Sequence, residues 1–239
     1  MPTIQDLSTY AAAIAPVVNA VHVNVHASAR QAAAAHAESC GVTPGLLADL
    51  RYVLPLRPLT RRELSAVYRY GSAADLDAEI RDHLDQDTVT EGREGLLRVA
   101  PRGLAFIDGL YAVHAATTRR IWAAHDLGPL AALAGRVLCH AGRDRGGALE
   151  VMAPPYEPEG TPAGVLLFNR LAALRYHRAD AHAAAWEAAG FTAGTIVDLQ
   201  GGPRRDGIED DTNRRAAQPY QCLTTDERGT LFEGLLTLL

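Results

Sequence analysis

The sequence predicts a mainly α fold that carries one small β-hairpin, and three observations support this expectation. Long helical segments are predicted over residues 5–38, 103–124 and 163–189. Two shorter helices, separated by a Gly-Ser turn, follow a Thr-x-x-Glu capping signal at residue 60. A short hairpin pattern comes directly after them. Together these features predict a helix-turn-helix followed by a two-stranded wing.

The N-terminal segment is predicted to be one long helix from about Gln5 to Glu38. Asp6 is available near its start and Gly41 closes it, as expected for helix caps. Pro16 lies inside this segment and could divide or kink the helix, because proline cannot donate a backbone hydrogen bond. A second, short helix is predicted from Pro44 to about Arg51.

The helix-turn-helix is predicted over residues 60–99. Thr60 and Glu63 have the spacing of a capping box, in which each residue's side chain satisfies the other's backbone N–H. In order, the segments are a helix at 61–70, a turn at Gly71 and Ser72, a helix at 73–85, and a hairpin pairing residues 88–91 with 96–99. A long amphipathic helix at 103–124 follows, which completes the layout of a winged helix between two long helices.

The second short helix has the wrong charge for reading DNA. In DNA-binding winged helices this element enters the major groove and carries basic or amide side chains. Here one arginine, Arg81, faces six acidic residues: Asp75, Asp77, Glu79, Asp82, Asp85 and Asp87. Arginines that could still contact DNA lie at the first short helix and on the wing: Arg61, Arg62, Arg93, Arg98 and Arg102. Nucleic acid is therefore an unlikely partner, because binding to duplex DNA depends on neutralising phosphates.

The second half of the chain is predicted to form another helical unit. Helices are expected at 129–140, 163–189, 208–218 and 226–238, with a strand at 192–199 and a turn at 201–207. The stretch 141–162 is rich in Gly, Pro and charge, which favours a linker. We expect one domain at 1–126 and a second at 127–239, and the second could be a degenerate winged-helix unit.

Three stretches resemble an actinobacterial family of helix-turn-helix-like proteins. They are RYVLPLRPLTRRELSAVYRYGSAADL at 51–76, LAALRYHRADAHAAAWEAAGF at 171–191, and GIEDDTNRRAAQPYQCL at 207–223. The order of a long helix, a winged helix and a long closing helix is also that of MarR-type regulators. The resemblance implies a MarR-like winged-helix architecture, and the terminal helices of such proteins usually build a homodimer.

Composition excludes several kinds of partner and chemistry. The net charge of -5 provides no overall attraction to nucleic acid or anionic lipid. All 23 basic residues are arginine, which excludes lysine-dependent chemistry and is typical of a GC-rich genome. Three widely separated cysteines, without a signal peptide or an apolar run of membrane-spanning length, favour reduced thiols and a cytoplasmic protein without a membrane partner. Gly-x-Ser-x-Gly, Gly-x-Gly-x-x-Gly and Walker motifs are absent, and the sequence does not identify a cofactor.

The helix at 163–189 carries the densest polar pattern. Arg175, Arg178, His182 and Trp186 fall on one stripe at ~100° per residue. Such a stripe could hold a carboxylate or phosphate on the guanidiniums while a planar group stacks on the indole. Two alternatives remain open: Arg178 and Asp180 could form salt bridges between helices with Trp186 in the core, or the stripe could follow a nucleic acid.

Two histidines, His22 and His26, recur at four-residue spacing on the first helix, followed by Arg30. This spacing can clamp a metal, but the third ligand would have to come from elsewhere, with His36, His182 and Asp180 as possible donors, and we predict no metal. Histidines interleaved with Val and Ala are also common as partly buried helix residues. The prediction retained here is that His22, His26 and His182 act as proton donors or acceptors in a pocket.

Tyr52, Arg57, Tyr68 and Tyr70 cluster around the helix-turn-helix, and the first three are predicted to bind a ligand. By analogy with MarR-type folds, a crevice between this unit and the terminal helices could hold an aromatic effector. The leading hypothesis is therefore a winged-helix scaffold that has lost DNA reading and binds a small acidic or aromatic molecule, and that could act as an enzyme of specialised metabolism. The alternative hypothesis is a dimeric, ligand-responsive transcription regulator. A third is a protein-interaction module that uses the acidic helix as its contact face.

Overall fold

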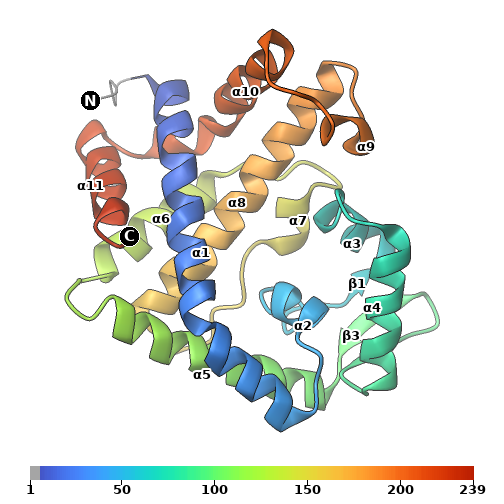
Figure 1. The fold of residues 1–239 in the computed structure, drawn as a ribbon. Helices are drawn as coiled ribbons and strands as arrows, with labels where there is room; N and C mark the ends of the chain where they lie inside the picture. The colour runs from blue at the N-terminus through green and yellow to red at the C-terminus, as the bar shows by residue number, and fades with distance from the viewer. Residues whose placement is uncertain (1–5) are drawn as a thin grey trace.

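The computed structural model describes residues 6–239 and confirms the mainly α prediction (Figure 1). One short three-stranded sheet accompanies the helices. In chain order the elements are α1 (Leu7–Cys40), α2 (Gly45–Leu50), β1 (Leu59–Thr60), α3 (Arg61–Val67), α4 (Ala73–Asp85), β2 (Val89–Glu91), β3 (Leu96–Val99), α5 (Pro101–Ile121), α6 (Gly128–His140), α7 (Ala148–Met152), α8 (Ala163–Ala188), α9 (Ala193–Ile196), α10 (Pro203–Ala216), the 3₁₀ helix η1 (Gln218–Cys222) and α11 (Thr225–Leu236).

Helix α1 is the long central element of the fold, and it packs against α5, α8, α10 and α11 (Figure 1). Its predicted start at Gln5 lies outside the described residues, and the helix begins at Leu7 with Asp6 accepting from the backbone N–H of Thr9. Gly41 ends it in the left-handed conformation, with φ of 61°. Pro16 does not divide α1, which is assigned as one helix from Leu7 to Cys40.

The segment 59–99 has the predicted order of helix, turn, helix and hairpin. Thr60 and Glu63 form the capping box that begins α3, and Ser72 caps α4. Strands β2 and β3 pair antiparallel with Val89 opposite Val99, and β1 adds to the other edge of β3. Buried Ile80 anchors α4 to the apolar core beneath it. The six acidic residues of α4 and the turn after it are all exposed: Asp75, Asp77, Glu79, Asp82, Asp85 and Asp87.

The predicted linker at 141–162 is wrong, because this stretch contains a buried helix. Ala148, Leu149, Val151 and Met152 of α7 are all buried. The two N–H groups of Ala148 and Leu149 donate to the carboxylate of Asp180 in α8, each at 2.8 Å. The glycines and prolines of the stretch flank α7, so local composition concealed a helix that tertiary contacts fix in place.

The predicted strand at 192–199 is also wrong. Thr192 and Thr195 form a capping box that begins α9. Ile196 and Leu199 then pack against Trp186 and Ile208, so helical spacing matches the available core contacts better than strand alternation. In residues 100–239, all of which the structure describes, no strand occurs, and α10 begins at Pro203 inside the predicted turn.

Apolar packing joins elements from both predicted domains. One buried cluster combines Val21 of α1 and Trp122, directly after α5, with residues of α6 and α8, such as Val137 and Phe168. A second cluster lies under α2, α3, α4 and the sheet, and it includes Val151 and Met152 of α7. The division at residues 126 and 127 stays a prediction, as does the homodimer.

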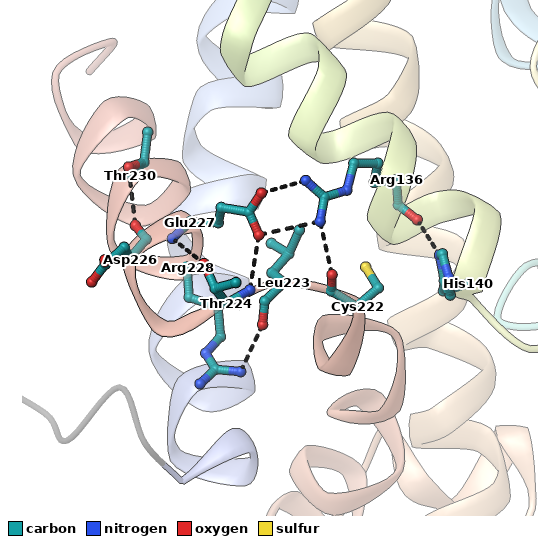
Figure 2. A network of polar contacts seen from close by, with 9 residues as sticks. All are labelled: Arg136, His140, Cys222, Leu223, Thr224, Asp226, Glu227, Arg228 and Thr230. Carbon is teal, nitrogen blue, oxygen red and sulfur yellow. Dashed lines mark hydrogen bonds and ion pairs between the residues drawn. The ribbon is translucent and has the colours of Figure 1, made fainter.

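The C-terminal helix is held to α6 by a polar network (Figure 2). Arg136 donates through Nη2 to the Glu227 carboxylate at 3.1 Å and to the carbonyl of Cys222 at 2.8 Å. Thr224 caps α11 in a capping box with the same glutamate. These contacts fasten η1 and α11 to the body of the fold.

Within residues 6–239, none of the helices is both long and apolar enough to cross a membrane. The three cysteines, Cys40, Cys139 and Cys222, are free thiols.

Candidate functional site

A cleft of about 680 Å³ opens between α1, α8, α9 and α10. Helix α8 contributes Arg175, Arg178 and His182, three members of the polar stripe predicted from the sequence. Other polar lining comes from Asn19 of α1, Tyr70 after α3, and Arg205, Glu209 and Thr212 of α10. The lining therefore contains three arginines and one carboxylate.

Arg175 makes its hydrogen bonds to two neutral side chains of α1. Its Nε donates to Asn19 Oδ1 at 3.0 Å, and its Nη1 lies 2.9 Å from His22 Nδ1. Because a guanidinium only donates, His22 must accept at Nδ1 and carry its proton on Nε2. Two side chains of α1 thus orient the Arg175 fork without neutralising its charge.

Arg178 and His182 are tied to α10. Arg178 donates to Asn213 Oδ1 at 2.9 Å and to Glu209 Oε2 at 3.3 Å. The Thr212 hydroxyl donates to the carbonyl of Ile208 at 2.7 Å, so it accepts from His182 Nδ1 at 3.1 Å. His182 consequently has its lone pair at Nε2. Burial, aided by Arg178, lowers the pKa of His182 against the opposing effect of Glu209, so the ring is neutral near pH 7 and can accept a proton.

His22 and His26 lie deeper than the cleft, in a cluster with His114 and Phe168. The His22 ring stacks on Phe168 at 4.9 Å and meets His26 edge-on at 4.7 Å. His114 lies 4.8 Å from the same phenyl ring. Burial is the main cause that lowers the pKa of His22 and of His114 to about 2 and that of His26 to about 4. All three rings are therefore neutral at physiological pH.

A buried cation adjoins this histidine cluster. Arg51 is 1% exposed, and its guanidinium lies 3.9 Å from the Tyr52 ring centroid and 5.1 Å from that of Phe168. It donates to the carbonyl of Ala48 and to the Tyr52 hydroxyl. The positive charge of Arg51 contributes to the low pKa of each clustered histidine, and sequence reasoning did not single out Arg51 or His114.

The structure separates the predicted site residues into two groups. Arg175, Arg178 and His182 line the cleft, and His22 touches it through Arg175. The remaining predicted residues do not line the cleft: His26, Tyr52, Arg57, Tyr68 and Trp186.

These remaining side chains have partners elsewhere. Arg57 pairs with Glu63 at 2.8 Å, and Tyr68 donates to Asp49 at 3.1 Å. Trp186 is buried in a small apolar cluster and donates to the hydroxyl of Tyr70 at 3.1 Å. The core location of Trp186 agrees with the alternative interpretation left open for it.

Sequence reasoning missed the contribution of α10. Four arginines, at 204, 205, 214 and 215, lie among acidic residues in the sequence, a pattern typical of a self-paired surface. Arg214 and Arg215 do pair with Asp211, at 3.1 and 2.8 Å, but Arg205 lines the cleft. Asn19 could have been found, because it lies three residues before His22 on the same helical face.

Among residues 6–239, no group of three or more His, Cys, Asp or Glu side chains is arranged to hold a metal ion. The third metal donors considered from the sequence have other partners: His36 bonds the carbonyl of Phe106, His182 bonds Thr212, and Asp180 pairs with Arg69.

Comparisons with known proteins returned no matching family model, no matching curated protein and no matching solved structure. The resemblance to helix-turn-helix-like proteins therefore stays a prediction.

Proposed function

We propose that this chain binds a small organic molecule with an acidic group in the cleft between α1, α8 and α10. The observation that carries the proposal is the charge of the lining, which contains three guanidiniums, of Arg175, Arg178 and Arg205, and one carboxylate, that of Glu209. This local excess of positive charge contrasts with the net charge of -5 for the whole chain. A cleft of this size matches the volume that small-molecule sites usually have.

Arg175 is the proposed anchor for the acid. Its fork is already oriented by Asn19 and His22, so little side-chain freedom is lost when a carboxylate binds. Arg178 is partly neutralised by Glu209 and would add a weaker contact. His182, neutral and with a free lone pair on Nε2, would accept a hydrogen bond or a proton from the bound molecule, and this is the group on which an enzymatic role would depend.

The scaffold we propose is a MarR-like winged helix that no longer reads DNA. The acidic residues of α4 are exposed, where they would repel phosphates. Arg61 pairs with Asp77 and Glu91, and Arg102 donates to three backbone carbonyls, so two of the candidate phosphate contacts are already engaged. Selective enrichment of duplex DNA by the purified protein would instead favour the alternative of a dimeric regulator.

Calorimetric titration with acetate, benzoate, succinate and inorganic phosphate tests the proposal. We expect at least one carboxylate to bind, and Arg175→Gln to weaken that binding about tenfold or more, as for loss of a charge-assisted contact. Arg143→Gln, which removes an exposed arginine that does not line the cleft, is the matched control. The proposal is refuted if no acid binds, or if both variants weaken binding equally.

A further inference from the structure

The cleft has an apolar rim beside its arginines. Val197, directly after α9, is 62% exposed and yet lines the cleft, together with Ile196 and with Pro16 of α1. Single apolar residues are common on protein surfaces, but here three of them border the same opening as the guanidiniums. The lining therefore combines guanidiniums with apolar side chains.

The segment that carries Val197 is packed against α8 and α10. Ile196 and Leu199 pack against Trp186 of α8 and Ile208 of α10. Thr192 caps α9 at its start. Because these contacts attach the segment to α8 and α10, the exposure of Val197 follows from how the segment is packed.

We infer that the cleft selects amphipathic carboxylic acids, with an alkyl or aryl body against Val197, Ile196 and Pro16 and the carboxylate on Arg175. This inference rests on the proposed function and narrows its ligand class. A fully hydrophilic acid, such as a sugar phosphate, would leave the apolar rim in water. When an amphipathic acid binds, its apolar body and the apolar side chains of the cleft bury each other's surface from water, which is favourable through the hydrophobic effect.

The test is a calorimetric series of straight-chain carboxylates, from butanoate through hexanoate to octanoate. Each methylene that becomes buried should tighten binding roughly fourfold, from the usual free energy of burying one CH₂ group. Val197→Ser should weaken octanoate binding by about five- to tenfold and butanoate binding by less than about twofold, from the loss of apolar contact. Arg175→Gln should weaken the whole series by a similar factor.

Leu56→Ser provides the matched control, because Leu56 is 50% exposed and does not line the cleft. Unchanged thermal melting of each variant confirms that folding is intact. Affinity that does not depend on chain length, equal effects of Val197→Ser and Leu56→Ser, or tighter binding of inorganic phosphate than of octanoate would each overturn the inference while leaving an acid-binding cleft. Failure of every carboxylate and of phosphate to bind would overturn the proposed function itself.

Discussion

The buried histidine cluster should make the stability of this protein depend steeply on pH. His22 and His114 are 5% and 4% exposed, and burial lowers the pKa of each from 6.5 to about 2. Both rings are neutral in the folded chain but take up protons once the chain unfolds below pH 6.5. The perturbation that isolates one of them is His114→Gln, which removes a titrating group and keeps a polar side chain.

The sign and size follow from proton linkage. As the pH falls below 6.5, the unfolded chain binds protons that the folded chain excludes, so acid favours unfolding. The stability that these two neutral histidines contribute is fully present above pH 6.5. It is lost as the pH falls from 6.5 toward their pKa values in the folded chain. Each such histidine adds a slope of ~1.4 kcal/mol per pH unit to the free energy of unfolding. His22 and His114 together therefore contribute about 2.7 kcal/mol per unit over this window.

The assay is urea unfolding, followed by circular dichroism, at several pH values between 6 and 4.5. His114→Gln should reduce the slope of unfolding free energy against pH by ~1.4 kcal/mol per pH unit. This change in slope does not depend on how much unfolding free energy the substitution removes at pH 8. The other histidines with lowered pKa values, including His83 and His177, contribute to both proteins and cancel in the difference. His125→Gln removes an exposed ring and serves as the control. An unchanged slope in His114→Gln would refute the burial argument.

Three further predictions concern stability, each measured by urea unfolding at pH 7.5. Asp180→Ala should lower the free energy of unfolding by roughly 3–5 kcal/mol, because it removes a buried carboxylate that pairs with Arg69 and caps α7. Asp77→Asn, in an exposed ion pair, should lower it by less than about 1 kcal/mol. Gly103→Ala should destabilise the fold by about 2–3 kcal/mol, because the added Cβ would lie 2.1 Å from the backbone carbonyl oxygen of Thr88. Gly207→Ala, with open space around it, should be neutral or stabilising by up to ~1 kcal/mol. Thr224→Ala should cost about 1 kcal/mol through loss of the α11 cap (Figure 2), and no measurable loss would contradict this role.

Much of the local structure could be predicted because short-range interactions determine it. The capping box at Thr60, the left-handed glycine at Gly41 and the helix over 73–85 with Ser72 before it were all confirmed. Each depends on side chains and backbone groups within a few residues of one another. Sequence reasoning failed at 148–152 and 192–199, where the Asp180 carboxylate and the α8–α10 surface decide the conformation.

The same distinction between local and long-range interactions applies to the candidate site. Helical periodicity was enough to place Arg175, Arg178 and His182 on one face of α8, because the spacing of side chains along a helix is fixed by its geometry. The sequence also determined the mainly α class and the acidic character of α4.

Only the tertiary structure decided what that face of α8 meets. Packing of α10 against α8 brings Arg205 and Glu209 to the cleft, and packing of α1 brings Asn19 and His22 to Arg175. Packing also places His114 beside Phe168, where burial rather than residue type lowers the histidine pKa. These contacts join residues far apart in the chain, and their selection depends on how whole apolar faces fit together, which no local pattern in the sequence specifies.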